Sequence, residues 1–217
     1  VVPQNAISQD GVDDNFDIAE TTGLPISATT STYTIEMWVR GEPQTGIYLW
    51  SETNTGLSLF GVATGNTDPS KVYIFKRNNA GVSTIDMDGS ITAFDGQWHH
   101  IAYVNNGTTG TLYVDGVFDF TDNSVDAIVP TLTSHLGSAR GTSAFFDGEI
   151  DEVRIWNIAR DQIDIQNDMD IELTGSESGL VAYYNFNQET GTNLPDVSLN
   201  GNDGTWTGPA GTNTTPN

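Results

Sequence analysis

Short runs in which apolar and polar residues alternate fill most of this chain, and turns rich in Gly, Asn and Asp separate them. The clearest run is residues 33–40, where Tyr33, Ile35, Met37 and Val39 would share one face of a strand. Comparable runs follow at residues 47–51, 57–62, 72–76, 82–87, 98–104, 111–114, 117–120, 132–137 and 180–187. The pattern predicts about twelve to fourteen short strands and hence a sandwich of two antiparallel sheets.

A helical pattern is confined to residues 159–169, where Asp161 is placed to cap a short helix. The dipeptide Asp115-Gly116 between two alternating runs predicts a tight β-hairpin of type I′. We therefore expect an all-β chain with one short helix near residues 159–169.

The segment Phe145–Trp156 joins an Asp147-Gly148 turn to a strand that carries charged residues. Strict alternation would place Asp151 on the same side as Val153 and Ile155. A buried carboxylate needs a partner, so we expect Asp151 to lie near a cation or near backbone N–H groups. A second acidic turn, residues 10–14, lies near the N-terminus, and we expect the two turns to meet in space.

The chain has 217 residues and a formal net charge of −22, with 7 basic against 29 acidic residues. Nucleic acid and anionic membranes are poor partners for such a surface. No apolar run is long enough to insert into a membrane, and the absence of cysteine excludes disulfides and thiolate metal sites. The chain starts at Val1, without a visible signal peptide, which is typical of a mature or excised piece of a larger protein.

Five motifs occur in an order that resembles a known family. They are Asp10-Gly11-Val12-Asp13-Asp14, Tyr33–Val39, Asp95–His100, Leu112–Gly116 and Asp147–Trp156. The chain resembles laminin-G-like domains of the concanavalin-A-like lectin/glucanase superfamily, in the bacterial branch related to pentraxins. The resemblance implies a jelly-roll sandwich over residues 1–206, and residues 207–217 read as a flexible linker or tail.

The resemblance also implies an extracellular or cell-surface module, secreted and tethered to other domains, and it implies a frequent calcium site. The segment Gly179–Phe186, with residues 200–204, often opens a domain of this type but here closes the chain. It would either complete this sandwich beside the N-terminal strand, which we favour, or begin a following repeat.

Calcium prefers six to eight oxygen ligands from carboxylates, carbonyls and water. The predicted ligands of a structural Ca²⁺ are Asp10, Asp13, Asp151 and the Gly11 carbonyl. Asp14 and Asp147 are further candidate ligands. The alternative is that these aspartates only accept hydrogen bonds from turn N–H groups.

Sugar binding needs aromatic plates with hydrogen-bonding groups beside them. The candidate ligand-binding residues are Trp50, Tyr73, Arg77 and Phe146, with Trp38 and Trp206 as further candidate plates. Packing in the core is the alternative for each aromatic residue. The charge of −22 favours a neutral glucan or galactan over a uronate or sulfated glycan.

Catalysis finds little support in the sequence. His99 and His100 would point to opposite faces of one strand and could not share a metal. Related jelly-roll glucanases carry Glu-x-Asp-x-x-Glu on one strand, but here Arg154 follows Glu149 and Asp151 at the last position. The leading hypothesis is therefore a non-catalytic, calcium-stabilised carbohydrate-binding module of a secreted bacterial polysaccharide-degrading protein. The alternatives are a calcium-dependent adhesion or protein-interaction domain of a surface protein and, less favoured, a jelly-roll glycoside hydrolase.

Overall fold

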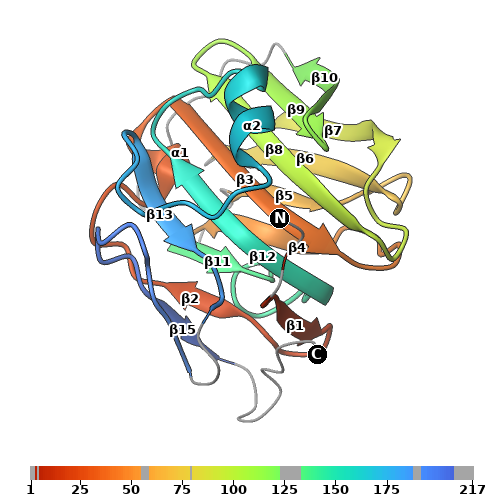
Figure 1. The fold of residues 1–217 in the computed structure, drawn as a ribbon. Coiled ribbons are helices and arrows are strands. Elements are labelled where there is room, and N and C mark those ends of the chain that lie inside the picture. Colours follow the sequence, from red (N-terminus) through yellow and green to blue (C-terminus); the bar gives the residue numbers. More distant parts are fainter. Residues whose placement is uncertain are drawn as a thin grey trace.

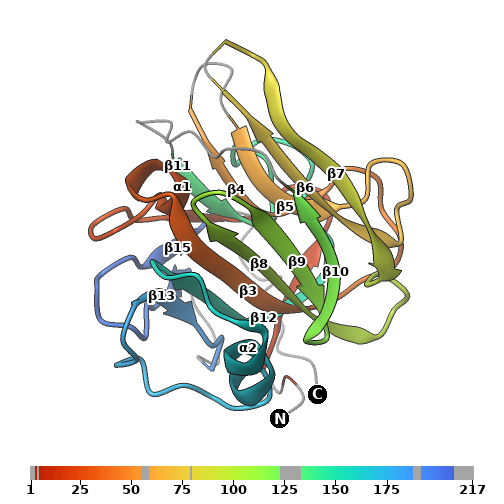
Figure 2. The ribbon, with the colours of Figure 1, turned by 90° about the horizontal axis from the view of Figure 1, so that it is seen from above.

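A computed structural model describes residues 3, 5–54, 59–78, 80–122, 133–187 and 192–207. Figures 1 and 2 show two layered antiparallel sheets with one helix packed on the outside of the first layer. The first sheet has seven strands in the order β1-β12-β3-β8-β9-β10, and β13 also pairs with β12. The second has eight strands in the order β14-β15-β2-β11-β4-β5-β6-β7. The predicted all-β jelly-roll sandwich is confirmed.

The strands of the seven-stranded sheet are β1 (Ile7–Asp10), β3 (Thr32–Arg40), β8 (Trp98–Asn106), β9 (Gly110–Val114), β10 (Val117–Asp122), β12 (Asp147–Trp156) and β13 (Leu180–Tyr184). Those of the eight-stranded sheet are β2 (Phe16–Ile18), β4 (Tyr48–Thr53), β5 (Leu59–Thr64), β6 (Lys71–Arg77), β7 (Ser83–Thr92), β11 (Thr133–Leu136), β14 (Asn193–Leu194) and β15 (Gly204–Trp206). The helices are α1 (Ile26–Thr29) and α2 (Gln162–Asp168).

Local sequence signals account for several of these boundaries. The side chain of Asp161 accepts a hydrogen bond from the Asp164 N–H at 2.8 Å, so the expected cap begins helix α2. Asp115 and Gly116 have φ angles of 51° and 68°, as a type I′ turn between β9 and β10 requires. The single turn α1 was not predicted, because residues 24–32 carry loop-forming residues.

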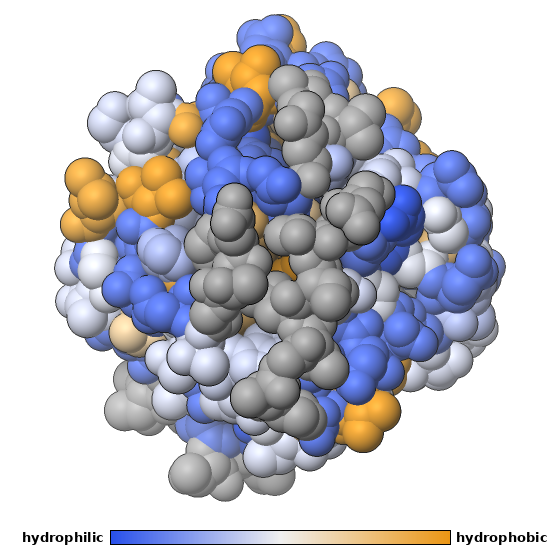
Figure 3. All heavy atoms as spheres, turned by 60° about the horizontal axis from the view of Figure 1, so that its bottom comes forward, coloured by the Kyte–Doolittle hydropathy of each residue, from blue (hydrophilic) through white to orange (hydrophobic). Residues whose placement is uncertain are grey.

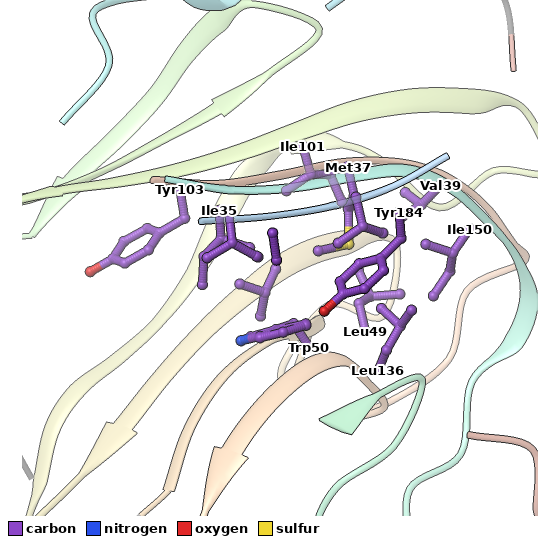
Figure 4. Packing of buried hydrophobic residues seen from close by; sticks show 14 of the residues in the cluster. Ile35, Met37, Val39, Leu49, Trp50, Ile101, Tyr103, Leu136, Ile150 and Tyr184 are labelled. Carbon is purple, nitrogen blue, oxygen red and sulfur yellow. The ribbon is translucent and has the colours of Figure 1, made fainter. Parts of the chain in front are cut away.

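The core lies between the two sheets, and alternate residues of each strand point their side chains into it. Ile35, Met37 and Val39 of β3 are buried against Leu49 and Trp50 of β4 (Figure 4). Successive strand residues point to opposite faces, so the alternation seen in the sequence fixes which side chains enter this layer.

The C-terminal segment closes this sandwich. Strand β13 pairs with the second half of β12, and β15 pairs with β2. The buried Asn202 side chain fastens the segment by accepting hydrogen bonds from the N–H groups of Thr21 and Thr22 and donating to the carbonyls of Thr22 and Val181. Neither described helix is long and apolar enough to cross a membrane.

Candidate functional site

The two acidic turns meet at one end of the seven-stranded sheet. In the antiparallel register of β1 and β12, Asp10 lies opposite Asp147, and the Gly11 N–H donates to the Phe146 carbonyl at 3.1 Å. A Cβ added to Gly11 would lie 2.9 Å from the Asp147 Cβ, so only glycine fits this approach. The predicted meeting of the turns is therefore confirmed.

Three carboxylates gather in the first turn. Asp10, Asp13 and Asp14 each offer an oxygen within 4.8 Å of the others, and Asp14 is fully buried. Part of this arrangement serves the turn itself: Asp10 Oδ1 accepts from the Val12 N–H at 2.9 Å, and Asp14 Oδ2 accepts from the Asp10 N–H at 3.0 Å. These bonds leave further lone pairs on the carboxylates, and such a set of hard oxygens fits the ligand chemistry of Ca²⁺.

The prediction that Asp151 shares this cluster is wrong. Asp151 lies four positions along β12 from Asp147, which is about 13 Å at the rise of a β-strand. A β-bulge interrupts the pairing with β3 between Asp151 and Arg154, and Glu152 adopts a positive φ of 52°. The bulge breaks the alternation, so Asp151 pairs with Trp38 while Val153 and Ile155 enter the core.

A hollow of about 340 Å³ opens beside the meeting point of the turns. Its volume is within the range of small-ligand sites. It is lined by Ser8, Gln9, Arg40, Gly41, Glu42, Gly96, Asp147, Gly148 and Glu149. We call it the rim hollow.

Residues on the two neighbouring strands position the Arg40 side chain in the rim hollow. This residue pairs with Glu149 of β12 on one side and with Trp98 of β8 on the other. Its guanidinium forms an ion pair with Glu149 and lies 5.2 Å from the centre of the Trp98 ring. The arrangement presents an orientated guanidinium with carboxylate acceptors around it, which can bind the hydroxyl groups of a polyol.

His99 stabilises the turn that forms one wall of the hollow. Its Nδ1 lies 2.8 Å from an Asp115 oxygen and its Nε2 lies 3.2 Å from an Asp95 oxygen. Burial alone would lower the pKa of His99, but the hydrogen bonds and charges of Asp115 and Asp95 outweigh it and raise the pKa. The imidazole thus ties the turn at residues 95–97, which contains Gly96, to the β9–β10 hairpin.

Most of the aromatic residues predicted to bind a ligand lie elsewhere. Trp50 and Phe146 are completely buried, and Trp50 packs between the sheets (Figure 4). Tyr73 is 7% exposed and Trp206 is 6% exposed. As freely exposed plates these four predictions are wrong, because the strands turn their large apolar surfaces into the core or against neighbouring side chains.

The other two candidates are partly accessible. Trp38 is half-buried on the outer face of the seven-stranded sheet and donates to the Met169 carbonyl at 2.8 Å. Arg77 is half-buried, with its guanidinium 5.9 Å from the Phe75 ring centre. Arg77 ends β6 of the other sheet and is not among the residues that line the rim hollow.

The carboxylates of residues 149–152 diverge. Glu149 pairs with Arg40, Asp151 is buried, and Glu152 pairs with Arg154 and accepts from the Tyr183 hydroxyl at 2.8 Å. His99 and His100 lie opposite Val39 and Trp38 respectively, so they face opposite sides of β8, as expected.

Sequence reasoning missed Arg40, Glu42 and Trp98 as a group. Cross-strand pairing brings Arg40 and Trp98 together, although 58 positions separate them in the sequence. The Asp-Gly turn before Trp98 and the end of the strand at Arg40 were visible, but no local pattern specified their register.

Most of the described surface at this end of the molecule is hydrophilic, and hydrophobic residues form separate patches on it (Figure 3). The surface therefore suits a polar ligand better than an extended apolar partner.

Comparisons with known proteins identify the family. A profile described as concanavalin A-like lectin/glucanases superfamily matches residues 10–166, and the chain belongs to this superfamily. Mouse pappalysin-1 is 30% identical over an alignment of 160 residues, which covers 64% of this chain and 10% of that protein. The chain thus spans about a tenth of the length of this relative.

Solved structures share the fold at low sequence identity. A Bacteroides ovatus protein provisionally assigned to carbohydrate binding aligns with a TM-score of 0.67 and 15% identity, covering 94% of this chain and 59% of that one. A heptameric pentraxin of Limulus polyphemus aligns with a TM-score of 0.58 and 15% identity, covering 76% of this chain and 82% of that one. A sialidase carbohydrate-binding module of Ruminococcus gnavus aligns with a TM-score of 0.59 and 14% identity, covering 74% of this chain and 95% of that one.

Proposed function

We propose that this chain is a non-catalytic carbohydrate-binding domain that binds a neutral glucan or galactan in the rim hollow. The observation that carries the proposal is the hollow itself. It combines the orientated guanidinium of Arg40 with the carboxylates of Glu42, Asp147 and Glu149. Sugar hydroxyls both donate and accept hydrogen bonds, so they can satisfy both kinds of group.

Electrostatics supports a neutral ligand. Arg40 is the single cation among the lining residues, and it already forms an ion pair with Glu149. An anionic sugar would meet the remaining carboxylates and the net charge of −22. A neutral sugar avoids this repulsion and uses the carboxylates as acceptors.

The structural neighbours support carbohydrate binding at the level of the class. The Bacteroides ovatus protein is provisionally assigned to it, and the Ruminococcus gnavus module was solved with α2,3-sialyllactose. Mouse pappalysin-1 is about ten times as long as the matched segment. From these similarities we propose that this domain is secreted and works beside other domains of a bacterial polysaccharide-degrading protein.

We further propose that Asp10, Asp13 and Asp14 hold a structural Ca²⁺, with Gly11 contributing its carbonyl. Asp14 bonds to the last residue of β1, and Asp10 lies opposite Asp147 of the hollow. An ion bound by this turn would stiffen the junction of β1 and β12 and so the wall of the hollow. Its role is to hold the site in shape.

Titration calorimetry with oligosaccharides of glucose and of galactose tests the sugar site. Glu42→Gln is expected to weaken binding about tenfold, since it replaces a charged acceptor with a neutral one. Glu172→Gln is the matched control, because this exposed glutamate is not among the lining residues and the amide keeps an acceptor for Asn185 and Asn187. If the wild-type chain binds neither sugar series nor the parent polysaccharides, with or without Ca²⁺, the proposal is overturned in favour of an adhesion or protein-interaction domain.

Thermal unfolding with Ca²⁺ and with a chelator tests the metal. At about 100 times the dissociation constant, binding to the folded state adds about 2.7 kcal/mol to the free energy of unfolding. The gain should disappear in Asp13→Asn and persist in Asp151→Asn. An equal gain in both variants would place the ion elsewhere.

A further inference from the structure

The outer surface of the eight-stranded sheet carries a group of aromatic residues that the rim hollow does not use. Val72 and Ile74 of β6 enter the core. The alternate residues of this strand, Tyr73 and Phe75, therefore point to the opposite face of the sheet. None of the nine residues that line the rim hollow belongs to β4, β5, β6 or β7. The two surfaces therefore have no residue in common.

Tyr48 joins these residues because of an irregularity in β4. A β-bulge between Tyr48 and Trp50 lets Trp50 enter the core while Tyr48 stays on the outer face. The Tyr48 ring lies over Gly61 of β5, where a Cβ would lie 2.2 Å from a ring carbon. Glycine at this position thus makes room for the tyrosine to lie against the sheet.

Tyr73 and Phe75 extend the same surface on the neighbouring strand. Their rings are stacked with centroids 5.8 Å apart and an interplanar angle of 26°. Residues 61 and 63 of β5, between β4 and β6, are the small Gly61 and Ala63, which pair with Phe75 and Tyr73. Tyr73 is only 7% exposed and supports Phe75 by stacking, so the half-buried Tyr48 and Phe75 carry the accessible ring surface. We call Tyr48, Tyr73 and Phe75 the aromatic platform.

Positively and negatively charged side chains surround the aromatic platform. Arg77 lies over Phe75 at 5.9 Å, and the exposed Asp86 accepts from the Tyr73 hydroxyl at 2.7 Å. Arg140 reaches the same region from the segment that follows β11, and it acts with Arg77 on Tyr48. Burial raises the pKa of Tyr48 to about 12 despite the two guanidinium groups, so its hydroxyl remains a donor.

This composition distinguishes a sugar from other occupants. The most exposed large hydrophobic residues in the described part of the chain are Val12, Val82, Val117, Phe118, Ile158, Ile163, Ile171 and Leu199, and none of them lies on β4 to β7. A protein partner would need a larger apolar centre than the platform offers. The presence of Asp86 beside Arg77 likewise disfavours a strongly anionic ligand.

We propose that the aromatic platform is a second carbohydrate-binding surface, on which a neutral pyranose ring stacks while Arg77, Asp86 and the Tyr48 hydroxyl bind its hydroxyl groups. The apolar face of a pyranose ring matches an aromatic plate, and its equatorial hydroxyls reach the polar groups at the edge. The inference rests on the proposed function, because it assigns a second surface to the same class of ligand. Two surfaces on one domain would raise its avidity for an extended polysaccharide without any new contact.

Calorimetry of the whole chain with short oligosaccharides of glucose and of galactose tests this inference. We expect two sites per chain, with Phe75→Ala weakening one of them about tenfold and leaving the other unchanged. Phe118→Ala is the matched control, since Phe118 is 52% exposed on β10, away from the platform. Phe75→Trp should retain both sites, which separates loss of stacking from loss of folding.

The outcomes separate the two proposals. One site per chain that Glu42→Gln weakens and Phe75→Ala leaves intact would overturn the platform and keep the rim hollow. One site that Phe75→Ala and Arg77→Gln weaken and Glu42→Gln leaves intact would keep the platform and overturn the hollow. Absence of any binding to the wild-type chain would overturn both.

Discussion

His99 and His100 are neighbours in the sequence whose environments have opposite effects on their protonation. His99 lies between two carboxylates, which raise its pKa. His100 is completely buried, and burial together with Arg154 and Arg160 lowers its pKa to about 3. Because strand residues alternate between faces, one position along β8 decides whether the surroundings raise or lower the pKa of an imidazole.

We expect His99→Gln to lose stability mainly at acidic pH. A histidine with a raised pKa in the folded state contributes most below its unfolded pKa of about 6.5, and the contribution is lost as the pH rises through the folded pKa. Urea unfolding of the wild type and the variant at about pH 5 and about pH 8.5 measures this. A difference in free energy that is the same at both pH values would show that the ion pairs with Asp95 and Asp115 contribute nothing.

Replacement of Gly11 should disturb the rim of the hollow. Its φ is +75°, and an added Cβ would lie 2.9 Å from the Asp147 Cβ. We expect Gly11→Ala to lower the free energy of unfolding by about 2 kcal/mol, from backbone strain and steric contact together. Gly46→Ala is the control, because Gly46 has a φ of +65° with nothing within 4 Å of the added Cβ. Equal losses in the two variants would remove the contact with Asp147 from the explanation.

At the scale of elements, helix α2 is fixed to the seven-stranded sheet by a buried polar network. Arg160, just before the helix, lies 2.6 Å from Glu36 Oε1 and 4.3 Å from the centre of the Trp156 ring. Trp156 Nε1 donates to the same Glu36 oxygen at 2.5 Å. Gln162 and Gln166 donate to the Gly116 carbonyl, which ties the helix to the β9–β10 hairpin as well.

Removing one partner of this network should cost more than removing both. Arg160→Ala leaves the carboxylate of Glu36, which is 0% exposed, without its cation, and we expect a loss of about 3–5 kcal/mol. The double variant Glu36→Met with Arg160→Met should recover most of this loss, since no buried charge remains. Chemical denaturation of the single and double variants measures both values. A double variant no more stable than Arg160→Ala would indicate that packing, and not charge, holds the helix.

At the scale of the whole molecule, residues near the two ends of the described chain depend on each other. β15 pairs with β2, and Asn202 bonds to residues 21 and 22 and to Val181 of β13. At another edge, Asp119 of β10 accepts from the Ser90 N–H of β7 at 2.8 Å and so joins the two sheets. Both links use one polar side chain to satisfy several backbone groups at once.

Asn202→Ala should destabilise the whole sandwich and not only its last strands. The change leaves the backbone groups of Thr21, Thr22 and Val181 without their partner, and we expect a loss of about 3 kcal/mol. Hydrogen exchange should then show faster exchange in β2 and β13 alike. Faster exchange confined to residues 193–207 would show that this segment unfolds independently of the rest.

Sequence patterns were sufficient for most of the strands. Alternation in residues 33–40 and 72–76, the Asp115-Gly116 turn and the Asp161 cap are local signals, and each corresponds to an element of the structure. They were also sufficient to expect that the turns at residues 10–14 and 147–148 meet, since both turns are acidic and a shared cation would offset their charge. Local preference and the order of motifs therefore determined the architecture.

The composition of the sites depended on registers and bulges that no local pattern specifies. The four positions that separate Asp151 from Asp147 along β12 keep it out of the acidic cluster, and a bulge after Tyr48 put Trp50 into the core and left Tyr48 outside. Cross-strand pairing alone brought Arg40 to Trp98 and Glu149. The sequence by itself determined which residues form strands and turns, because those preferences are local. Only the tertiary structure decided which side chains share a surface, because a shift of one residue moves a side chain to the opposite face of a sheet.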